Sequence, residues 1–468
     1  MPTKHDLPEW LDERAQRFTT MSDEIWRHPQ VALQETFACA LQIADLKAEG
    51  FAITERVGGL PTAFVAEWGR GAPIIGFVGE YDALPNLSQE NGPTQRPLVE
   101  QGPGHGCGHN LLGTACLASA VVIKQWLEST GQPGTVRYYG CPAEETITGK
   151  VFMVRDGVFD DLDAAITWHP GWTNTVSKGS SLAVDNLKFR FHGKTAHAAM
   201  APHLGRSALD AVELMNVGAN FLREHVSDPV RIHYVITNGG GAPNVVPDEA
   251  EVWYFVRAPL RTQVEETTAR VRKIAQGAAL MTETTTDEAY LCGAYNMINS
   301  DYLGDLALAA MRGLGPIAFT PEEQAFAATI AEGFPEGTRE RGLEILDLPL
   351  TLLEQPLNGA VHPPNDAGKV MPGSTDVGDV SWVTPTTTIS TATWALGIPA
   401  HSWGTTATGA MSIGHKGMLY AAKVMALTAA DLYTEPSHLA AARAEFERTL
   451  GNQRYKTPLP EGLAPTLP

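Results

Sequence analysis

The sequence predicts an α/β protein with a mixed sheet, interrupted by an inserted α+β unit. Strand-like and helix-like runs alternate up to about residue 181, and α/β patterning returns after residue 300. Between them, residues 182–296 read β-α-β-β-α-β, the ferredoxin-like pattern. A chain of 468 residues is also long for one domain. We therefore expect one domain made of residues 1–181 and 297–468, with residues 182–296 inserted as a second.

The expected elements of the first half surround a long apolar run at residues 111–128, which predicts a buried helix capped by Asn110. Apolar residues at helical spacing predict two more helices within residues 8–49, separated at His28-Pro29. Short apolar or alternating runs predict strands, and the run at 73–78 is apolar enough to be buried on both faces. The predicted strands of this half are 51–55, 62–68, 73–78, 134–140 and 163–168.

The second half is less regular. Residues 315–372 are rich in Glu, Pro and Leu without a clear period, and we expect helices and loops there. A strand at 386–391 and a final helix at 415–433 follow, and the last residues predict a Pro-rich tail. The inserted unit is predicted as strand 182–192, helix 206–225, strands 230–237 and 251–257, helix 262–280 and strand 282–292.

Charge and composition exclude several classes of protein. The net charge of −19 opposes binding to nucleic acid or to an anionic membrane, both of which need a basic face. No run approaches 18 uncharged apolar residues, and the first residues lack the apolar core of a signal peptide. Five scattered cysteines, an odd number, are typical of a reducing compartment rather than of a disulfide framework. We therefore expect a cytoplasmic protein that binds neither nucleic acid nor a membrane.

The loop at residues 102–110, GPGHGCGHN, is the strongest functional motif in the chain. Glycines flank its ligand-type side chains, so the backbone can turn tightly and aim Cys107 and His109 inward. The loop matches neither a dinucleotide-binding nor a P-loop pattern. A thiolate and an imidazole two residues apart, directly before a helix, are typical of a metal site. His105 would face the opposite side of an extended loop, and we expect it to be structural.

Predicted strands elsewhere end in further ligand-type side chains. Glu80 and Asp82 follow one strand, and each could instead be a solvated strand end. Glu144 and Glu145 follow a second, and His169 follows a third. Adjacent carboxylates after a buried strand repel each other unless a positive group, such as a metal ion, lies between them. The convergence favours a metal site at the carboxyl edge of the sheet.

With these motifs the sequence resembles the M20 family of metallopeptidases and amidohydrolases, in its aminoacylase-like and hippurate-hydrolase-like branch. The matching stretches keep the same order over nearly the whole chain. They are GEYDALP, GHGCGHNLLGTA, GCPAEE, TWHP, GKTAHAAMAPHLGRSALDA, PNVVPD, STDVGDVSW and HKGM. The resemblance implies that residues 1–181 and 297–468 form a di-metal catalytic domain, and that residues 182–296 form a lid and dimerisation domain.

The resemblance also implies the ligands of two divalent metal ions per chain, zinc or manganese. Cys107 would bridge the two ions, where other branches of the family have an aspartate. Spacing alone does not show which ion each of the other ligands would bind. The implied ligand set is Cys107, His109, Glu145, His169 and His401.

Other residues would act on the substrate or on the ligands. By the same resemblance, Glu144 would be the catalytic base and Asp82 would hold a ligand imidazole. His197, Asn244 and Arg257 would reach the substrate from the lid, and in dimeric members of the family the lid histidine comes from the neighbouring subunit. The planar fork of Arg257 suits a substrate carboxylate.

The activity implied is metal-dependent hydrolysis of a linear amide bond in an N-acyl or N-aroyl amino acid of the p-aminobenzoyl-glutamate type, or in a small dipeptide. The substrate would carry a free carboxylate, and the assembly would be a homodimer or include a heteromeric partner subunit. One alternative is a non-catalytic, metal-bound partner or regulatory subunit, against which the intact Glu144 argues. Another is a carbamoyl-amide hydrolase, against which Cys107 argues.

Two positions depart from the pattern of the branch. Asn110 stands where CGHD is common, so one carboxylate beside the metal ligands is missing. Ser374-Thr375-Asp376 stands where many members have Ser-Glu-Asp, which leaves the role of that loop open.

Overall fold

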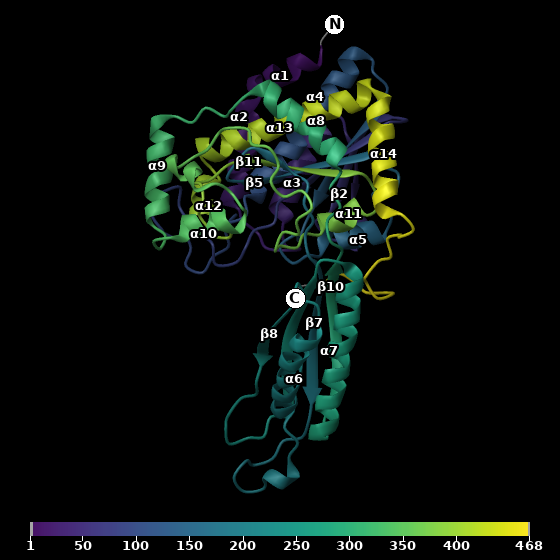
Figure 1. Ribbon diagram of the computed structural model, residues 1–468, viewed down its shortest axis with the longest axis vertical. Helices are drawn as coiled ribbons and strands as arrows, with labels where there is room; N and C mark the ends of the chain where they lie inside the picture. Colours follow the sequence, from purple (N-terminus) through teal and green to yellow (C-terminus); the bar gives the residue numbers. More distant parts are fainter. Residues whose placement is uncertain (1–2, 467–468) are drawn as a thin grey trace.

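The computed structural model describes residues 3–466, which form two sheets. The larger sheet has seven strands in the order β1-β2-β4-β3-β5-β11-β6, and the smaller has four in the order β10-β7-β9-β8. Figure 1 shows the smaller sheet, with helices α6 and α7, projecting from the body that holds the larger one. The predicted fold class, an α/β protein with a mixed sheet and an inserted α+β unit, is confirmed.

Four neighbouring strands of the larger sheet, β4, β3, β5 and β11, run parallel. The edge strands pair antiparallel with their neighbours. Because parallel strands point the same way, their carboxyl ends gather at one edge of the sheet. The bounds are β1 (Ala52–Glu55), β2 (Phe64–Arg70), β3 (Ile74–Glu80), β4 (Gly134–Cys141), β5 (Ala164–Gly171), β6 (Thr175–Ser177) and β11 (Thr386–Ala392).

Alternate residues of β3 pack on opposite faces of this sheet. Ile75 and Phe77 lie in the main apolar cluster with most of the helices, whereas Val78 packs into a second cluster that includes α5. The apolar run at 73–78 is therefore covered on both faces, as predicted. The helices of the body are α1 (Leu7–Glu13), α2 (Ala15–Arg27), α3 (Thr36–Ala48), α4 (His109–Thr130), α5 (Gly149–Arg155), α8 (Asp301–Leu314), α11 (Val377–Ser381), α12 (Trp403–Thr408), α13 (Ser412–Thr434) and α14 (Pro436–Leu450).

The central helix of the body is α4. It is long and apolar enough to cross a membrane by length and composition, but 89% of its most apolar window is buried inside the protein. Such burial is typical of the core helix of a globular domain.

Three sequence predictions need correction here. Asn110 does not cap α4: Gly108, with φ 75°, precedes the helix, and Asn110 lies inside it. The Asn110 amide instead donates to Ser22 Oγ at 2.9 Å and to Gly409 O at 2.8 Å, so it ties three segments together. The region 8–49 holds three helices rather than two, because α1 and α2 are separate. A further helix, α14, follows α13, and Pro436 takes its first position, where proline is well tolerated.

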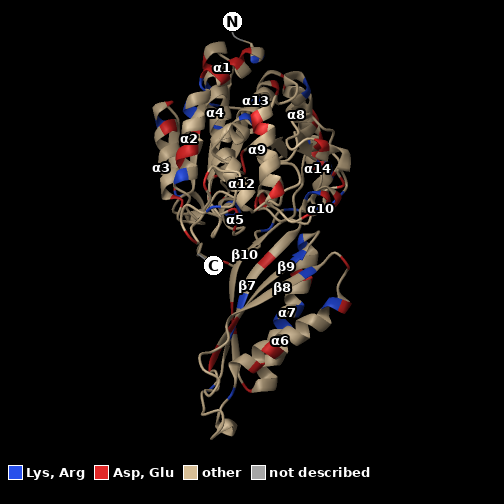
Figure 2. Ribbon diagram, turned by 90° about the vertical axis from the view of Figure 1, so that its left-hand side faces the viewer, with Lys and Arg blue, Asp and Glu red and all other residues tan. Residues whose placement is uncertain are grey.

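The inserted unit has the predicted β-α-β-β-α-β order, and its antiparallel sheet packs on α6 and α7 through a core of its own. Figure 2 shows both helices on one side of the sheet. Its elements are β7 (Ala183–His192), α6 (Ala208–Leu222), β8 (Arg231–Asn238), β9 (Glu249–Ala258), α7 (Arg261–Thr282) and β10 (Thr285–Ala294).

Residues 315–372 form α9 (Pro321–Glu332), α10 (Thr338–Ile345), a 3₁₀ turn and long loops. Figure 1 shows α9, α10 and α12 together at one side of the body. Ile330 of α9 packs with Trp394 and Trp403 in a small apolar cluster. This cluster fixes the irregular segment against the loop that follows β11.

Candidate metal centre and active site

The glycine-rich loop enters the carboxyl edge of the larger sheet and brings Cys107 to His169. Cys107 Sγ lies 3.2 Å from His169 Nε2, and Cys107 is buried. His169 is in β5, and its Nδ1 lies 2.7 Å from the Pro170 carbonyl oxygen. That hydrogen bond requires a proton on Nδ1, which leaves Nε2 with a free lone pair facing the thiol.

His109, in the first turn of α4, is held by Asp82. Its Nδ1 lies 2.9 Å from Asp82 Oδ1, and the other carboxylate oxygen of Asp82 accepts the Glu145 backbone N–H at 2.9 Å. His109 Nε2 is buried without a hydrogen-bond partner among residues 3–466. Asp82 therefore orients both the imidazole and the loop that carries Glu145, as a carboxylate beside a metal-binding histidine does.

Two sets of donor atoms converge on Cys107. In one set, the donors of Cys107, His109 and His169 all lie within 4.8 Å of one another. In the other, the same holds for Cys107, Glu145 and His401. Sharing one thiol between two triads is the arrangement that two metal ions with a bridging thiolate require.

His401 comes from the loop before α12. Its Nε2 lies 3.5 Å from Glu145 Oε2, and its backbone N–H donates to Gly106 O at 3.1 Å. His401 has a left-handed φ of 54°, a conformation that non-glycine residues adopt at a cost. The hydrogen bond to Gly106 thus fixes a distant loop beside the glycine-rich one.

The pKa values and hydrogen bonds of these side chains indicate whether the cluster suits a metal ion. Burial raises the pKa of the Cys107 thiol, and it raises the pKa of Glu145 to about 7. Glu145 Oε1 is buried and, like His109 Nε2, has no hydrogen-bond partner within the described chain. Buried donor atoms without hydrogen-bond partners are what a divalent ion would satisfy. The residues present therefore fit a metal centre.

Glu144 lies beside both triads without belonging to either. Its carboxylate forms a third close set with Glu80 and His109, again within 4.8 Å. Burial, and then the negative charges of Glu80 and Glu145, raise the pKa of Glu144 well above its usual value. A carboxylate in this position can hold or release a proton next to the metal ligands.

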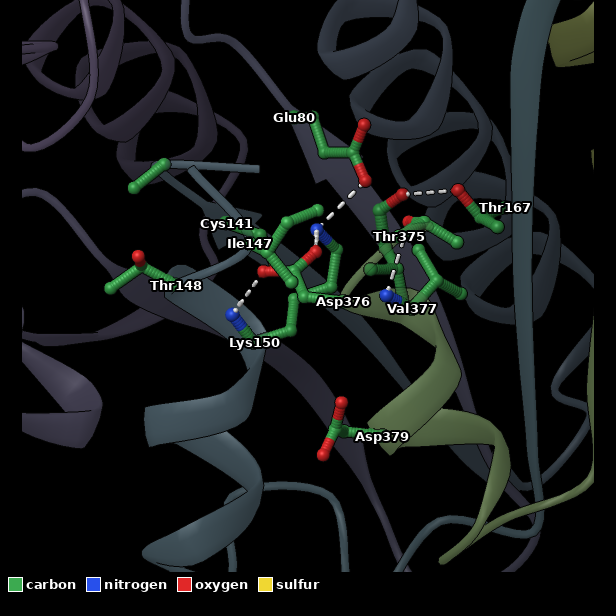
Figure 3. Close-up of polar contacts among 12 residues, drawn as sticks. Glu80, Cys141, Ile147, Thr148, Lys150, Thr167, Thr375, Asp376, Val377 and Asp379 are labelled. Atoms are coloured by element: carbon green, nitrogen blue, oxygen red, sulfur yellow. Dashed lines mark hydrogen bonds and ion pairs between the residues drawn. The ribbon is translucent and has the colours of Figure 1, made fainter. Parts of the chain in front are cut away.

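The sequence did not predict the buried ion-pair cluster of Lys150, Glu80 and Asp376, which Figure 3 shows. Lys150 of α5 has no exposed surface, and its Nζ pairs with Glu80 at 2.8 Å and also with Asp376. Asp376 also accepts the Lys150 backbone N–H at 2.7 Å. The Ser-Thr-Asp loop thus holds the lysine that neutralises Glu80, and Glu80 is a site carboxylate rather than a solvated strand end.

A second unforeseen residue is Glu35, which precedes α3. One of its carboxylate oxygens accepts the Ala143 N–H at 3.0 Å, and the other accepts from the Thr62 hydroxyl at 2.7 Å. Ala143 has a left-handed φ of 58° and directly precedes Glu144. Glu35 therefore supports the strained turn that presents Glu144, and no local sequence pattern signals this role.

A cavity of 440 Å³ lies between the body and the inserted unit, and its lining includes Glu80, Cys107, Glu144, Glu145, His169 and His401. Arg257 of β9 lines it together with Cys107, Glu144 and His169. The Arg257 guanidinium lies over the Phe255 ring at 5.2 Å, and its Nε has no partner in the part of the chain described. An unpaired guanidinium opposite the metal ligands is suited to bind a carboxylate.

His197 and Asn244 lie elsewhere. They belong to the segments 193–207 and 239–248, which follow β7 and β8 at the end of the inserted unit far from the body (Figure 1). There the Ala198 N–H donates to Asn244 O at 2.9 Å. The strand β7, which leads from the body to this end, has ten residues, or roughly 33 Å at ~3.3 Å per residue. Neither residue lines the cavity formed by residues 3–466 of the same chain.

Sequence comparisons identify relatives of this chain. A peptidase dimerisation domain matches residues 184–282. One of the subunits of p-aminobenzoyl-glutamate hydrolase from Escherichia coli is 44% identical over 471 residues, covering 98% of both chains. The Xaa-Arg dipeptidase of Mus musculus is 29% identical, covering 96% of this chain and 94% of the relative.

Solved structures show the same fold at low identity. An aminobenzoyl-glutamate utilization protein from Klebsiella pneumoniae superposes with a TM-score of 0.62 at 19% identity, covering 91% of this chain and 98% of that one. A dinuclear metal-binding M20 peptidase from Bacillus subtilis gives 0.58 at 19% identity, covering 90% and 99%. The fold and the matches define a metal-dependent hydrolase that acts on amide bonds. The chain belongs to the M20 peptidase family.

Proposed function

We propose that this protein cleaves the amide bond between an acyl or aroyl group and an amino acid that carries a free carboxylate. The observation that carries the proposal is one cavity whose lining includes Arg257, Glu144 and every member of the two Cys107 triads except the fully buried His109. A relative 44% identical over nearly the whole chain is named for p-aminobenzoyl-glutamate, which is an amide of this class.

The two triads would each hold one divalent ion, with the Cys107 thiolate between them. His109 and His169 would complete one ion's ligands, and Glu145 and His401 the other's. Thiolate and imidazole favour zinc, while the carboxylate also tolerates manganese. When bound, such ions polarise an amide carbonyl and lower the pKa of water.

Glu144 would move the proton. Its carboxylate lies close to His109 of the first triad, but Glu144 belongs to neither of the two triads that share Cys107. It would accept a proton from the attacking water and later give it to the leaving nitrogen. Asp82 would keep His109 in the tautomer that leaves Nε2 free, and Glu35 would hold the turn at Ala143 that aims Glu144.

Arg257 would bind the carboxylate of the substrate and so fix the carbonyl against the metal ligands. We expect Arg257→Ala to lower kcat/KM on carboxylate substrates. The loss should correspond to about 2–4 kcal/mol of transition-state stabilisation, the scale of unpairing a buried charge contact. On the matching amidated substrates the loss should be small, because the partner charge is absent.

The matched control is Arg231→Ala. Arg231 lies opposite Arg257 on the neighbouring strand β8 but does not line the catalytic cavity, and its guanidinium donates to backbone carbonyls. Equal losses on carboxylate and amidated substrates, or the same loss from Arg231→Ala, would show that Arg257 has only a structural role.

We propose that the inserted unit, residues 182–296, is a lid that pairs with a second chain. Strand β8 is an unpaired edge of its sheet, and the apolar side chains of Leu214, Val217 and Phe221 are exposed on α6. Edge strands and exposed apolar patches are the usual sites of association. His197 and Asn244 of one chain would then complete the cavity of the other.

The partner would be a second copy of the chain. A related but different chain is the alternative, since two similar proteins of E. coli are named as different subunits of one hydrolase. We also propose a cytoplasmic location, which the five free, buried cysteines support.

A further inference from the structure

A large apolar side chain, Met200, is 80% exposed three positions after His197. Both residues belong to one tight turn. The N–H groups of Met200 and Ala199 donate to His197 Nδ1 at 3.1 and 3.3 Å, and the Ala201 N–H donates to His197 O at 2.9 Å. Because these hydrogen bonds close the turn on itself, Met200 keeps a fixed position relative to His197.

A hollow of 250 Å³ on the body adjoins the glycine-rich loop that carries Cys107. Residues 103–104 of that loop line it, together with Leu98 and Val99, which are each 62% exposed. Val99 packs directly on the loop, since a Cβ added at Gly102 would lie 2.8 Å from Val99 Cβ. Neighbouring exposed aliphatic side chains beside a hollow are typical of a surface that binds an apolar group.

The spacing along the body matches the spacing along the turn. Gly104, which lines the hollow, stands three positions before Cys107, which lines the catalytic cavity. His197 likewise stands three positions before Met200. Three residues of chain span at most roughly 11 Å. A turn that brings His197 to the cavity of a body therefore brings Met200 within reach of the hollow on the same body.

The body in question is that of another chain, because the turn lies at the end of the inserted unit far from its own body (Figure 1). We propose that Met200 of one chain inserts into this hollow on a second copy and so positions His197 at the second copy's catalytic cavity. An unbranched, flexible methionine suits an irregular apolar hollow. The proposal rests on the proposed pairing of two chains, and it makes Met200 a positioning residue.

Methionine oxidation tests this contact without requiring activity. Met281, which is 65% exposed near the end of α7, lies at the same end of the inserted unit and is the internal control. In the assembled protein, hydrogen peroxide should oxidise Met200 at least about 10-fold more slowly than Met281, because oxidation follows exposure. Val99→Asp should remove this protection, since a carboxylate in the hollow opposes apolar burial. Mass spectrometry of peptides measures both rates.

Three results of this measurement would overturn the proposal. Equal oxidation of Met200 and Met281 in a protein that sediments as a dimer would show that Met200 is not covered. Protection that survives Val99→Asp would place Met200 somewhere other than the hollow. Sedimentation as a monomer would overturn the pairing and this contact together.

Activity then shows whether the contact joins two chains. Met200→Glu and Val99→Asp should each lower kcat/KM at least about 10-fold, because burying a carboxylate in an apolar hollow is costly. Leu280→Glu is the control: it changes an 82% exposed side chain at the same end of the unit and should alter kcat/KM by no more than about twofold, as surface substitutions do.

A mixed dimer of Met200→Glu and Val99→Asp chains contains one contact in which both the methionine and the hollow are unchanged. Partial activity should therefore return when the subunits exchange, and demonstrated exchange without recovery would overturn the proposal. Protection of Met200 that depends on Val99, in a protein that hydrolyses no amide, would overturn the proposed function and keep the contact.

Discussion

Lys150 Nζ lies 2.8 Å from Glu80 Oε1, and neither side chain is open to solvent beyond 3%. The same ammonium pairs with Asp376, which has no exposed surface. The other oxygen of Glu80 lies 3.4 Å from His109 Nε2. One buried lysine therefore connects the Ser-Thr-Asp loop and α5 to the edge of the metal centre, as Figure 3 shows for Lys150, Glu80 and Asp376.

Replacing this lysine should be costly. Lys150→Met leaves two buried carboxylates without their cation, and removing one partner of a buried pair costs about 3–5 kcal/mol. We expect a loss of that size in the free energy of unfolding, measured by urea denaturation of the metal-free protein.

Lys124→Met is the control for this prediction. Lys124 pairs with Glu128 at 2.9 Å in an i,i+4 contact on α4, where the glutamate is 60% exposed and the lysine 12%, and i,i+4 pairs on helices contribute about 0.3–0.5 kcal/mol. If Lys150→Met were no less stable than Lys124→Met, the ion-pair cluster would not contribute to the fold, and Glu80 would need another explanation.

Substitutions of the neighbouring residues Glu144 and Glu145 should have different effects. Glu144→Gln should keep the bound metal while lowering kcat by roughly 10²–10⁴, the usual contribution of a general base. Glu145→Gln should instead lose metal, because its carboxylate belongs to one of the two donor triads that share Cys107, and Glu144 does not. Elemental analysis of both variants after dialysis distinguishes the roles, and the reverse pattern would exchange them.

Much of the fold could be predicted because local pattern and tertiary environment agree. Apolar β3 lies in the middle of a parallel sheet, and the β-α-β-β-α-β run folds as one unit with its own core. The prediction of the helix cap was wrong because the backbone conformation decides it: Gly108, not Asn110, is the residue before α4, since that position has a φ of 75° and glycine tolerates it. Residues 315–372 had no clear period because much of that segment is loop packed on Trp394 and Trp403.

In the candidate site, too, some residues could be predicted from the sequence and others could not. Cys107, Glu145 and His169 could be anticipated because each lies near the end of a strand or directly before a helix at the same sheet edge. Lys150 and Glu35 could not, since a single lysine in a short helix or a glutamate before a helix is ordinarily solvated. Their burial depends on partners more than sixty residues away in sequence. The roles implied for His197 and Asn244 depend on a second chain, which one sequence cannot place.

A mixing experiment tests that second chain. His197→Ala and Glu144→Gln should each be inactive alone, because one loses the distal histidine and the other its base. If His197 serves the partner's cavity, mixed dimers contain one intact site, and partial activity should return when subunits exchange. Exchange is followed by mass spectrometry of isotope-labelled chains. Demonstrated exchange without recovered activity would mean that His197 acts within its own chain or not at all.

The pH dependence of stability should report on Asp379 of α11. Its carboxylate accepts from the Tyr455 hydroxyl at 2.7 Å and from the Tyr295 N–H at 3.0 Å, and burial raises its pKa to about 7. In the unfolded chain an aspartate has a pKa of about 3.9. Between these values the folded state keeps a proton that the unfolded state has released. Rising pH therefore removes stability, by up to about 1.4 kcal/mol per pH unit, until pH passes about 7.

Asp379→Asn keeps a carbonyl acceptor for Tyr295 and cannot ionise. Its free energy of unfolding, relative to the unchanged protein, should therefore rise steadily from pH 5 to pH 7 and level off above. Asp161→Asn is the control: this carboxylate pairs with Arg137, hydrogen bonding to that arginine lowers its pKa, and its contribution is lost only at acid pH. Urea unfolding in chelator at each pH measures the differences. Parallel curves for all three proteins would show that Asp379 ionises in the folded state as readily as in water.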